Sequence, residues 1–158
     1  MPKSFQWNNY IRVWVDGKLG KYIINSFFIT IVSVFLVTFF SLLAGYPLAR
    51  FNFKGRDFLY GLFIAGMMFP VFLGLVPLFF LLDSLRILDT HTGLIFVCIG
   101  YGIPFGVFIL HSFFLTIPSE LEESAVIDGC SQFKLFFKVM MPLAKPGIVT
   151  MIIFQSIR

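Results

Sequence analysis

The sequence predicts an all-α protein that crosses a membrane several times. Of its 158 residues, 58% are hydrophobic and only 13% are charged, whereas soluble domains carry about 25% charged residues. The mean hydropathy is +0.92, and the chain holds 23 phenylalanines, more than one small water-soluble core could bury. Because lipid is itself apolar, phenylalanine side chains can face outward in a bilayer without cost. A polytopic membrane fold follows.

Four apolar runs define the expected spans. A membrane-spanning helix needs about 20 mostly apolar residues, which rise about 1.5 Å each. The first three runs are long enough and contain no Asp, Glu, Lys or Arg, while the fourth reaches about half a span. The chain is therefore expected to contain about three complete spans and a partial fourth, as a fragment would. The predicted spans are residues 22–49, 58–82, 92–117 and 147–158.

Composition excludes several classes of protein. The net charge of +4 is distributed over the ends of the spans rather than in one patch, so nucleic acid is not an expected partner. Cys98, Cys130, His91 and His111 have no metal-ligand spacing, and no metal site is expected. The uncharged spans also lack an acid–base set, which argues against an enzyme and against an ion-coupled carrier. They fit a transporter that is powered from outside the membrane.

Small and polar residues recur within the first and third spans. Offsets of three, four, seven and eight residues place most of those in the first span on one helical face. Small residues allow helix backbones to approach closely in lipid, so helix packing is the simpler interpretation and a polar pathway is the alternative. The residues concerned are Ser26, Thr30, Ser33, Ser41 and Gly45 in the first span, and Gly102 and Gly106 in the third.

Two prolines interrupt the second span. Pro70 and Pro77 lie seven residues apart and therefore share a helical face. Each proline removes a backbone hydrogen bond, so the sequence predicts that this span is kinked. A broken helix of this kind is compatible with alternating access.

Residues 118–146 form a polar island between apolar runs. Ser119 is expected to cap a first helix, and Glu122, three residues later, would complete a capping box. Gly129 stands where a left-handed residue would end that helix, and Ser131 can begin a second one. The island should therefore be a helix, a glycine turn and a helix. Phe133, Phe136 and Phe137 together are too apolar for a solvated loop, so they should contact either the spans or a partner.

The island resembles the EAA loop of binding-protein-dependent ABC importer permeases. That pattern is Glu-Ala-Ala, three residues, Gly, nine residues, Ile-x-Leu-Pro. Here it reads Glu123-Ser-Ala125, Gly129 and Val139-Met-Met-Pro142, with identical spacing and modest substitutions. By this resemblance, the loop would be the contact with an ATP-binding subunit. The implied contact residues are Glu123, Ser124, Ala125, Asp128, Gly129, Phe133, Phe136 and Pro142.

Further segments resemble the carbohydrate branch of these permeases, and within it the subunits similar to the maltose permease G component. They include Asn9-Tyr10, Asn25-Ser26, Ala49-Arg50-Phe51 and the run 117–129. The resemblance implies a type I ABC importer transmembrane domain (MetI-like fold) over residues 1–158, with residues 118–146 as the cytoplasmic coupling loop. It also implies a multi-pass protein of the bacterial or archaeal cytoplasmic membrane.

The implied partners are ATP-binding subunits, a companion permease subunit, an extracytoplasmic solute-binding protein and the lipid bilayer. No cofactor is expected in this chain, because the partner subunit would bind ATP. The resemblance further implies a chain truncated at both ends, since a complete permease of this type has six spans. Two alternatives stay open: a fragment that docks on the ATPase without transporting, and an ABC permease for a non-sugar solute. No residue is identified as a substrate ligand.

Overall fold

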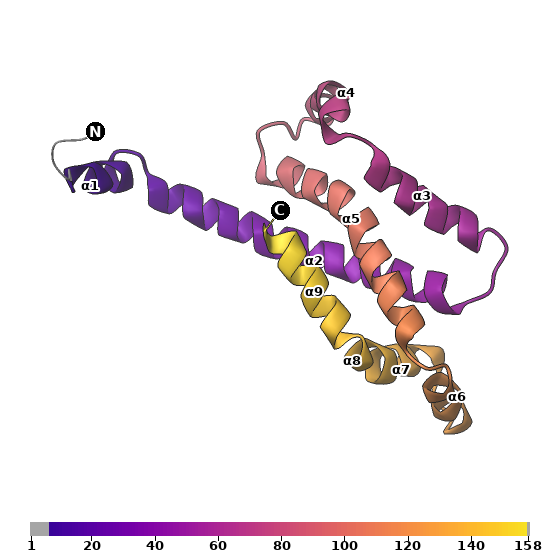
Figure 1. Ribbon diagram of the computed structural model, residues 1–158. Helices are drawn as coiled ribbons and strands as arrows, with labels where there is room; N and C mark the ends of the chain where they lie inside the picture. The colour runs from indigo at the N-terminus through magenta and orange to yellow at the C-terminus, as the bar shows by residue number, and fades with distance from the viewer. Residues whose placement is uncertain (1–6, 158) are drawn as a thin grey trace, which may run out of the picture.

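The computed structural model describes residues 7–157, apart from the side chains of residues 8, 9 and 11. The predicted domain 1–158 also includes residues 1–6 and 158, which lie outside the described residues. All regular elements in the described part are helical, as the sequence predicts (Figure 1). They are α1 (Asn8–Val15), α2 (Leu19–Arg50), α3 (Arg56–Met68), α4 (Val71–Ser84), α5 (His91–Thr116), α6 (Glu120–Ile127), α7 (Gln132–Leu135), the π-helical η1 (Phe136–Met140), α8 (Met141–Leu143) and α9 (Lys145–Ile157).

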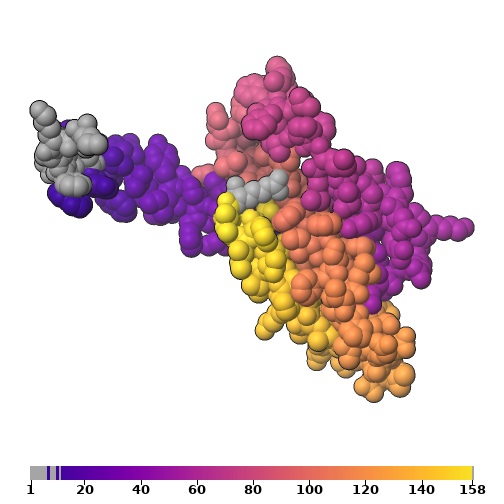
Figure 2. Space-filling model, viewed as in Figure 1, coloured from indigo at the N-terminus to yellow at the C-terminus, as the bar shows by residue number. Residues whose placement is uncertain are grey.

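The long helices α2 and α5 form the centre of the bundle. Both are long and apolar enough to cross a membrane, and they include nearly all of the predicted spans 22–49 and 92–117. Helix α5 packs along the C-terminal half of α2 and also contacts α3 and α9. Helix α1 and the first turns of α2 project away from the other helices (Figure 2). The assignment of each helix to a membrane span remains a prediction.

The second predicted span is two helices rather than one kinked helix. Helices α3 and α4 meet at 97°, and the break falls at Phe69 and Pro70. Proline disfavours the helical conformation of the residue before it, and Phe69 is accordingly extended, with ψ at 119°. Pro77 lies inside α4 without ending it. A proline at either position predicts a kink, and the sharp turn lies at Pro70 rather than at Pro77.

Close helix packing explains part of the small-residue pattern. A Cβ atom added to Gly106 would collide with the side chain of Ser41, so α5 reaches α2 only because this residue is glycine. A Cβ atom at Gly45 would lie 3.3 Å from the Leu110 Cβ, a tight contact on the same interface. The packing interpretation is thereby confirmed for these residues.

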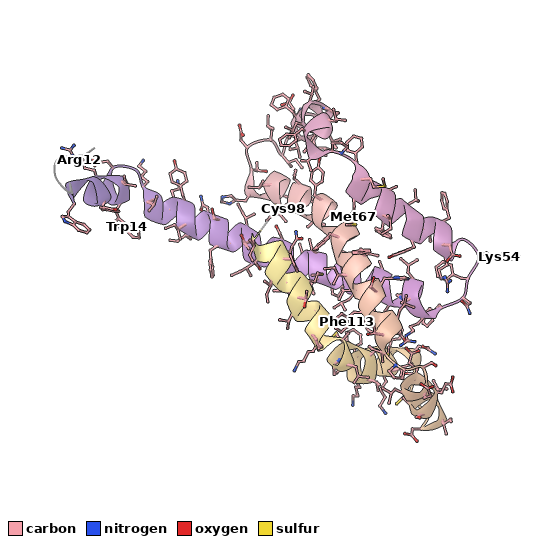
Figure 3. The ribbon with its side chains drawn as sticks, in the orientation of Figure 1. Arg12, Trp14, Lys54, Met67, Cys98 and Phe113 are labelled. Carbon is pink, nitrogen blue, oxygen red and sulfur yellow. The ribbon has the colours of Figure 1, made fainter. Side chains whose placement is uncertain are left out.

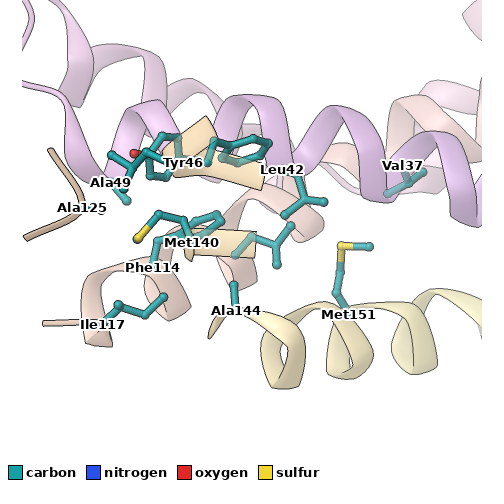
Figure 4. Close-up of a cluster of buried hydrophobic side chains, with 13 residues drawn as sticks. Val37, Leu42, Tyr46, Ala49, Phe114, Ile117, Ala125, Met140, Ala144 and Met151 are labelled. Atoms are coloured by element: carbon teal, nitrogen blue, oxygen red, sulfur yellow. The ribbon is translucent and has the colours of Figure 1, made fainter. Parts of the chain in front are cut away.

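A single apolar core joins the spans to the polar island. Its buried side chains come from α2, α5, η1 and α9, and Phe114, Leu110 and Met140 are fully enclosed (Figure 4). Ala125 of α6 and Leu135 of α7 belong to the same cluster. The island is therefore part of the helical bundle and not a separate loop. A displacement of the island would move the helices that share its core.

Candidate functional site

The turn between α6 and α7 has the geometry of a glycine-terminated helix. Gly129 has φ of 76°, in the left-handed region that the sequence predicts for it. The Cys130 N–H donates to the Ala125 carbonyl and the Gly129 N–H donates to the Val126 carbonyl, each at 3.0 Å. This pair of bonds is a Schellman motif, which satisfies carbonyls at the helix end. The chain thus reverses within a few residues and forms a compact knob, defined here as residues 119–135.

The predicted capping box at Ser119 is wrong. The Ser119 side chain makes no capping hydrogen bond, because its backbone already has helical dihedral angles. Glu122 points instead to Arg50, the last residue of α2. The second predicted cap is confirmed: the Ser131 hydroxyl accepts a bond from the Lys134 N–H at 3.4 Å. Local sequence rules missed the first interaction because its partner lies far away in the chain.

Arg50 ties three elements together. Its Nε atom lies 2.9 Å from Glu122 Oε1, and its guanidinium also donates to the Ile117 carbonyl, which caps the end of α5. The two side chains are only 12% and 18% exposed, so the ion pair is shielded from water. Burial raises the pKa of Glu122, while the positive charge of Arg50 acts in the opposite direction. The end of α2, the end of α5 and the first turn of α6 are therefore fixed to one another.

Aromatic packing reinforces this junction, which is the place where Arg50 joins the ends of α2 and α5 to the first turn of α6. The ring of Tyr46 on α2 lies 5.0 Å from that of Phe136 and 5.3 Å from that of Phe114. Phe136 is buried, so the predicted contact residue meets the spans and not a surface. Phe133 is the opposite case, with 81% of its side chain exposed.

The remaining predicted contact residues divide into an exposed and a supporting group. Ala125 is buried in the core, and the Ser124 hydroxyl donates to the Glu120 carbonyl of its own helix. Ile127 is 85% exposed on the knob; the motif did not single it out, although an apolar residue beside a glycine turn is a usable signal. The predicted contact residues on the exposed surface are Glu123, Ser124, Asp128, Gly129, Phe133 and Pro142.

Pro142 follows directly after the π-helical turn η1. A proline lacks the N–H that would bond four residues back, and its ring crowds that carbonyl. The N–H of Met141, the residue before the proline, donates to the Phe136 carbonyl, five residues back, rather than to a carbonyl four residues back. The wide turn places Phe136 and Met140 in the core, so Pro142 has a structural role behind the knob in addition to its exposed position.

A second feature lies deeper in the bundle, where α2, α4, α5 and α9 meet. A pocket of about 240 Å³ lies there, and Figure 3 labels Cys98, one of its lining residues, on α5. Its polar lining residues are Thr30, Ser33, Tyr101, Gln155 and Ser156. Among residues 7–157, no Asp, Glu, Lys or Arg lines it, and no group of three or more His, Cys, Asp or Glu there could hold a metal.

Known proteins are similar to this chain in both sequence and architecture. The chain is 40% identical to the diacetylchitobiose uptake system permease protein NgcG of Streptomyces coelicolor, over 98% of the chain and 51% of that protein. It is 37% identical to the arabinooligosaccharides transport system permease protein AraQ of Bacillus subtilis, over 99% of the chain and 55% of that protein. The chain thus spans about half the length of the curated relatives it matches.

A solved structure agrees with these relatives. The crystal structure of a bacterial ABC transporter involved in the import of the acidic polysaccharide alginate matches 99% of the chain and 55% of its own chain, with a TM-score of 0.84 and 26% identity. The family described as "binding-protein-dependent transport system inner membrane component" matches residues 38–158, which include Arg50, the knob and the part of the pocket that α4, α5 and α9 line. The chain belongs to this family of ABC importer permeases.

Proposed function

We propose that the chain is part of a permease subunit of an ATP-binding-cassette importer that moves a carbohydrate across the cytoplasmic membrane. A separate subunit binds and hydrolyses ATP, and the loop 118–146 receives its movement on the cytoplasmic side. One observation carries the proposal: the knob is fixed to both central helices by the Arg50 ion pair and by a shared core. A knob that is merely tethered could not transmit force.

The mechanism follows from this connection. A partner that displaces the exposed surface of α6 also displaces Glu122, and through it Arg50 at the end of α2. The same guanidinium holds the Ile117 carbonyl at the end of α5, so α2 and α5 move with the knob. Packed cores move between discrete arrangements rather than deforming continuously, so closure of an ATPase pair rocks the bundle between two orientations.

The exposed surface of the knob has the chemistry of a docking surface. Glu123 and Asp128 supply negative charge, while Ile127 and Phe133 supply apolar area for burial. Exposed apolar residues at the centre with charged residues around them are typical of protein interfaces. The partners of the whole protein are ATP-binding subunits, a companion permease subunit and a solute-binding protein outside the membrane, in a bacterial or archaeal cell.

A carbohydrate is the cargo that the comparisons favour. The relatives NgcG and AraQ are named for diacetylchitobiose and arabino-oligosaccharides, both uncharged solutes that are strongly polar because they are rich in hydroxyl groups. The pocket among α2, α4, α5 and α9 is polar but uncharged, which suits a neutral solute better than an ion. An importer for a non-sugar solute is the alternative, and transport assays with a panel of solutes separate the two.

A docking experiment tests the assignment of the knob. In the full-length protein, Glu123→Lys reverses a charge on the proposed surface and should lower the yield of ATPase that co-purifies with the permease by several-fold. Asp57→Lys is the control, because Asp57 is also an exposed acid and lies outside the knob. Equal co-purification of both variants would contradict the docking role of Glu123.

A transport experiment separates an active subunit from a docking fragment. The full-length protein is reconstituted with its ATPase, companion subunit and binding protein, and ATP-dependent uptake of radiolabelled diacetylchitobiose and arabino-oligosaccharide is measured. Uptake supports the importer. Docking of the ATPase without uptake of any solute in a wider panel would favour the non-transporting alternative.

A further inference from the structure

The pocket among α2, α4, α5 and α9 contains polar atoms that the fold leaves without partners. Ser33 is only 3% exposed, and its Oγ atom has no hydrogen-bond partner among the described residues. Gln155 presents a second such atom, Oε1. Both residues line the pocket. An unpartnered polar atom is costly in any apolar interior and most of all within a membrane, so these atoms call for a ligand.

Three other serines of these helices donate to main-chain carbonyls. The Ser41 hydroxyl donates to the Ile103 carbonyl, and the Ser112 hydroxyl donates to the Phe108 carbonyl one turn earlier in α5. Ser156, at the edge of the pocket, donates to the Ile152 carbonyl. Serine in a helix ordinarily satisfies itself in this way. The Ser33 hydroxyl does not, although the same kind of bond is open to it.

A pocket with aromatic walls adjoins the one at Ser33. It measures about 410 Å³ and shares Tyr101 and Val71 with its neighbour. Phe105 and Phe154 complete its aromatic lining, and their rings meet edge to face at 5.9 Å. Ligand sites typically combine such walls with a few convergent polar groups, in volumes of roughly 300–1,000 Å³. A sugar ring has matching surfaces, because its hydroxyl groups lie at the edge and its C–H groups form apolar faces.

We propose that these two pockets form a binding site for a neutral saccharide within the membrane. Ser33 and Gln155 bind ligand hydroxyl groups, and the aromatic residues around Tyr101 pack on the C–H faces of the ring. This inference rests on the proposed transport function and deepens it, because it assigns part of the sugar contact to this chain. Ser33 lies near the middle of the 32-residue helix α2, at a depth suited to a site on a transport path.

Helix packing places Gln155 in the site. A Cβ atom added to Gly102 would lie 2.6 Å from Gln155 Nε2 and 2.7 Å from a methyl group of Val37. The amide of Gln155 therefore rests against the bare backbone of α5, between α2 and α9. Glycine at position 102 thus makes room for a polar side chain, in addition to letting two helices approach each other.

Cys98 provides a native probe of whether the site is open to water. It is a partly exposed free thiol that lines the polar pocket. A charged methanethiosulfonate reagent reacts with the thiolate, which forms in water and not in lipid. In the assembled full-length transporter, the peptide that contains Cys98 should be modified, and saturating diacetylchitobiose or arabino-oligosaccharide should slow the modification. Cys98→Ser gives the blank for the mass-spectrometric measurement.

Uptake measurements test the ligand contacts themselves. Ser33→Ala and Gln155→Leu should each lower ATP-dependent sugar uptake by about 2- to 10-fold, the effect of one hydrogen bond, while assembly with the ATPase is unchanged. Ser112→Ala is the matched control, since that hydroxyl bonds to its own helix outside the pockets. It should leave uptake at the wild-type level.

The outcomes separate this inference from the proposed function. Labelled Cys98, protection by sugar and reduced uptake in both pocket variants would support the site. An unlabelled Cys98 would overturn it, whatever the transporter does. Wild-type uptake rates in Ser33→Ala and Gln155→Leu would also overturn it and would leave a pocket that holds only water. Failure of the wild-type transporter to take up either sugar would count against the proposed function, whereas labelling of Cys98 would still decide whether the pocket is hydrated.

Discussion

Arg50 at the junction and Ser33 in the pocket lie on the same helix, α2, but the polar groups around them have different surroundings. At the junction, the charge of Arg50 is paired with Glu122 and its guanidinium bonds to the Ile117 carbonyl. In the pocket, Ser33 Oγ and Gln155 Oε1 are buried without partners among the described residues. At the end of α2 two opposite charges therefore face each other, whereas at its middle the buried polar atoms are uncharged and line a pocket.

This difference shows how a single helix can serve two tasks. A shielded ion pair between two helices holds them in one geometry, which a junction that transmits force requires. Unsatisfied polar groups carry a free-energy penalty that a bound solute relieves, so they favour recognition over rigidity. Changes to the junction and to the knob it supports test how far transport depends on this rigidity.

The largest effect is expected from Arg50→Ala. This change leaves the Glu122 carboxylate shielded and unpaired, which makes the junction resemble the pocket. Loss of one partner of a buried pair costs about 3 kcal/mol, and the variant should show a lower midpoint of thermal unfolding in the full-length permease. Sugar uptake per ATP hydrolysed should also fall, because the knob is no longer fixed to α2.

Arg56→Ala is the control for that experiment. Arg56 also forms an ion pair at 3.0 Å, with Asp57, but the Asp57 side chain is 89% exposed. Exposed pairs contribute little, with a median below about 1 kcal/mol, so this variant should unfold and transport almost as the wild type does. Equal effects of the two substitutions would show that the Arg50 pair has no special role.

A smaller effect is expected from Gly129→Val. The left-handed conformation at this position is unfavourable for a β-branched residue by about 1–2 kcal/mol. No atom lies within 4 Å of an added Cβ, so backbone strain is the sole cause. The turn should distort and ATPase docking should weaken, as measured by co-purification.

Gly129→Asn tests whether position 129 requires the left-handed conformation or requires glycine as such. Asparagine adopts left-handed geometry at modest cost, so docking should largely be retained in this variant. If Gly129→Val docked as well as Gly129→Asn, the turn would not determine the shape of the docking surface.

The smallest effect is a dependence of stability on pH at the junction. Burial raises the folded-state pKa of Glu122 above its ordinary value of 4.5, so the folded protein holds this proton more tightly than the unfolded chain. Its contribution is therefore fully present below pH 4.5 and is lost as the pH rises through the folded-state pKa. Thermal unfolding of Glu122→Gln, compared with wild type across this range, should lack that loss; parallel curves would argue against a shielded carboxylate.

The sequence predicted well those features that depend on local composition. Runs of apolar residues located α2 and α5 to within a few residues, and the spacing of the EAA-like pattern located the turn at Gly129. These features follow from burial in lipid and from the backbone freedom of glycine. Neither requires knowledge of which helices are neighbours.

Features that depend on distant neighbours were missed. Glu122 was expected to bond to the start of its own helix, but Arg50, 72 residues earlier, is its partner. Phe136 was expected on the docking surface, but Tyr46 and Phe114 enclose it. The local pattern also did not distinguish Pro70, where the helix breaks, from Pro77, which lies inside α4. None of these partners can be identified from local pattern.

The π-helical turn η1 determines which aromatic face the end of the island presents. Its hydrogen bond runs from the Met141 N–H to the Phe136 carbonyl and encloses one residue more than an α-helical turn does. Each residue of an α-helix rotates the chain by about 100°, so the extra residue changes the rotational register between α7 and α9. Deletion of one residue from 137–139 would restore α-helical winding and turn Phe133 and Phe136 relative to α9. The length of this segment, and not only its composition, thus sets the angular phase between the docking surface and the last helix.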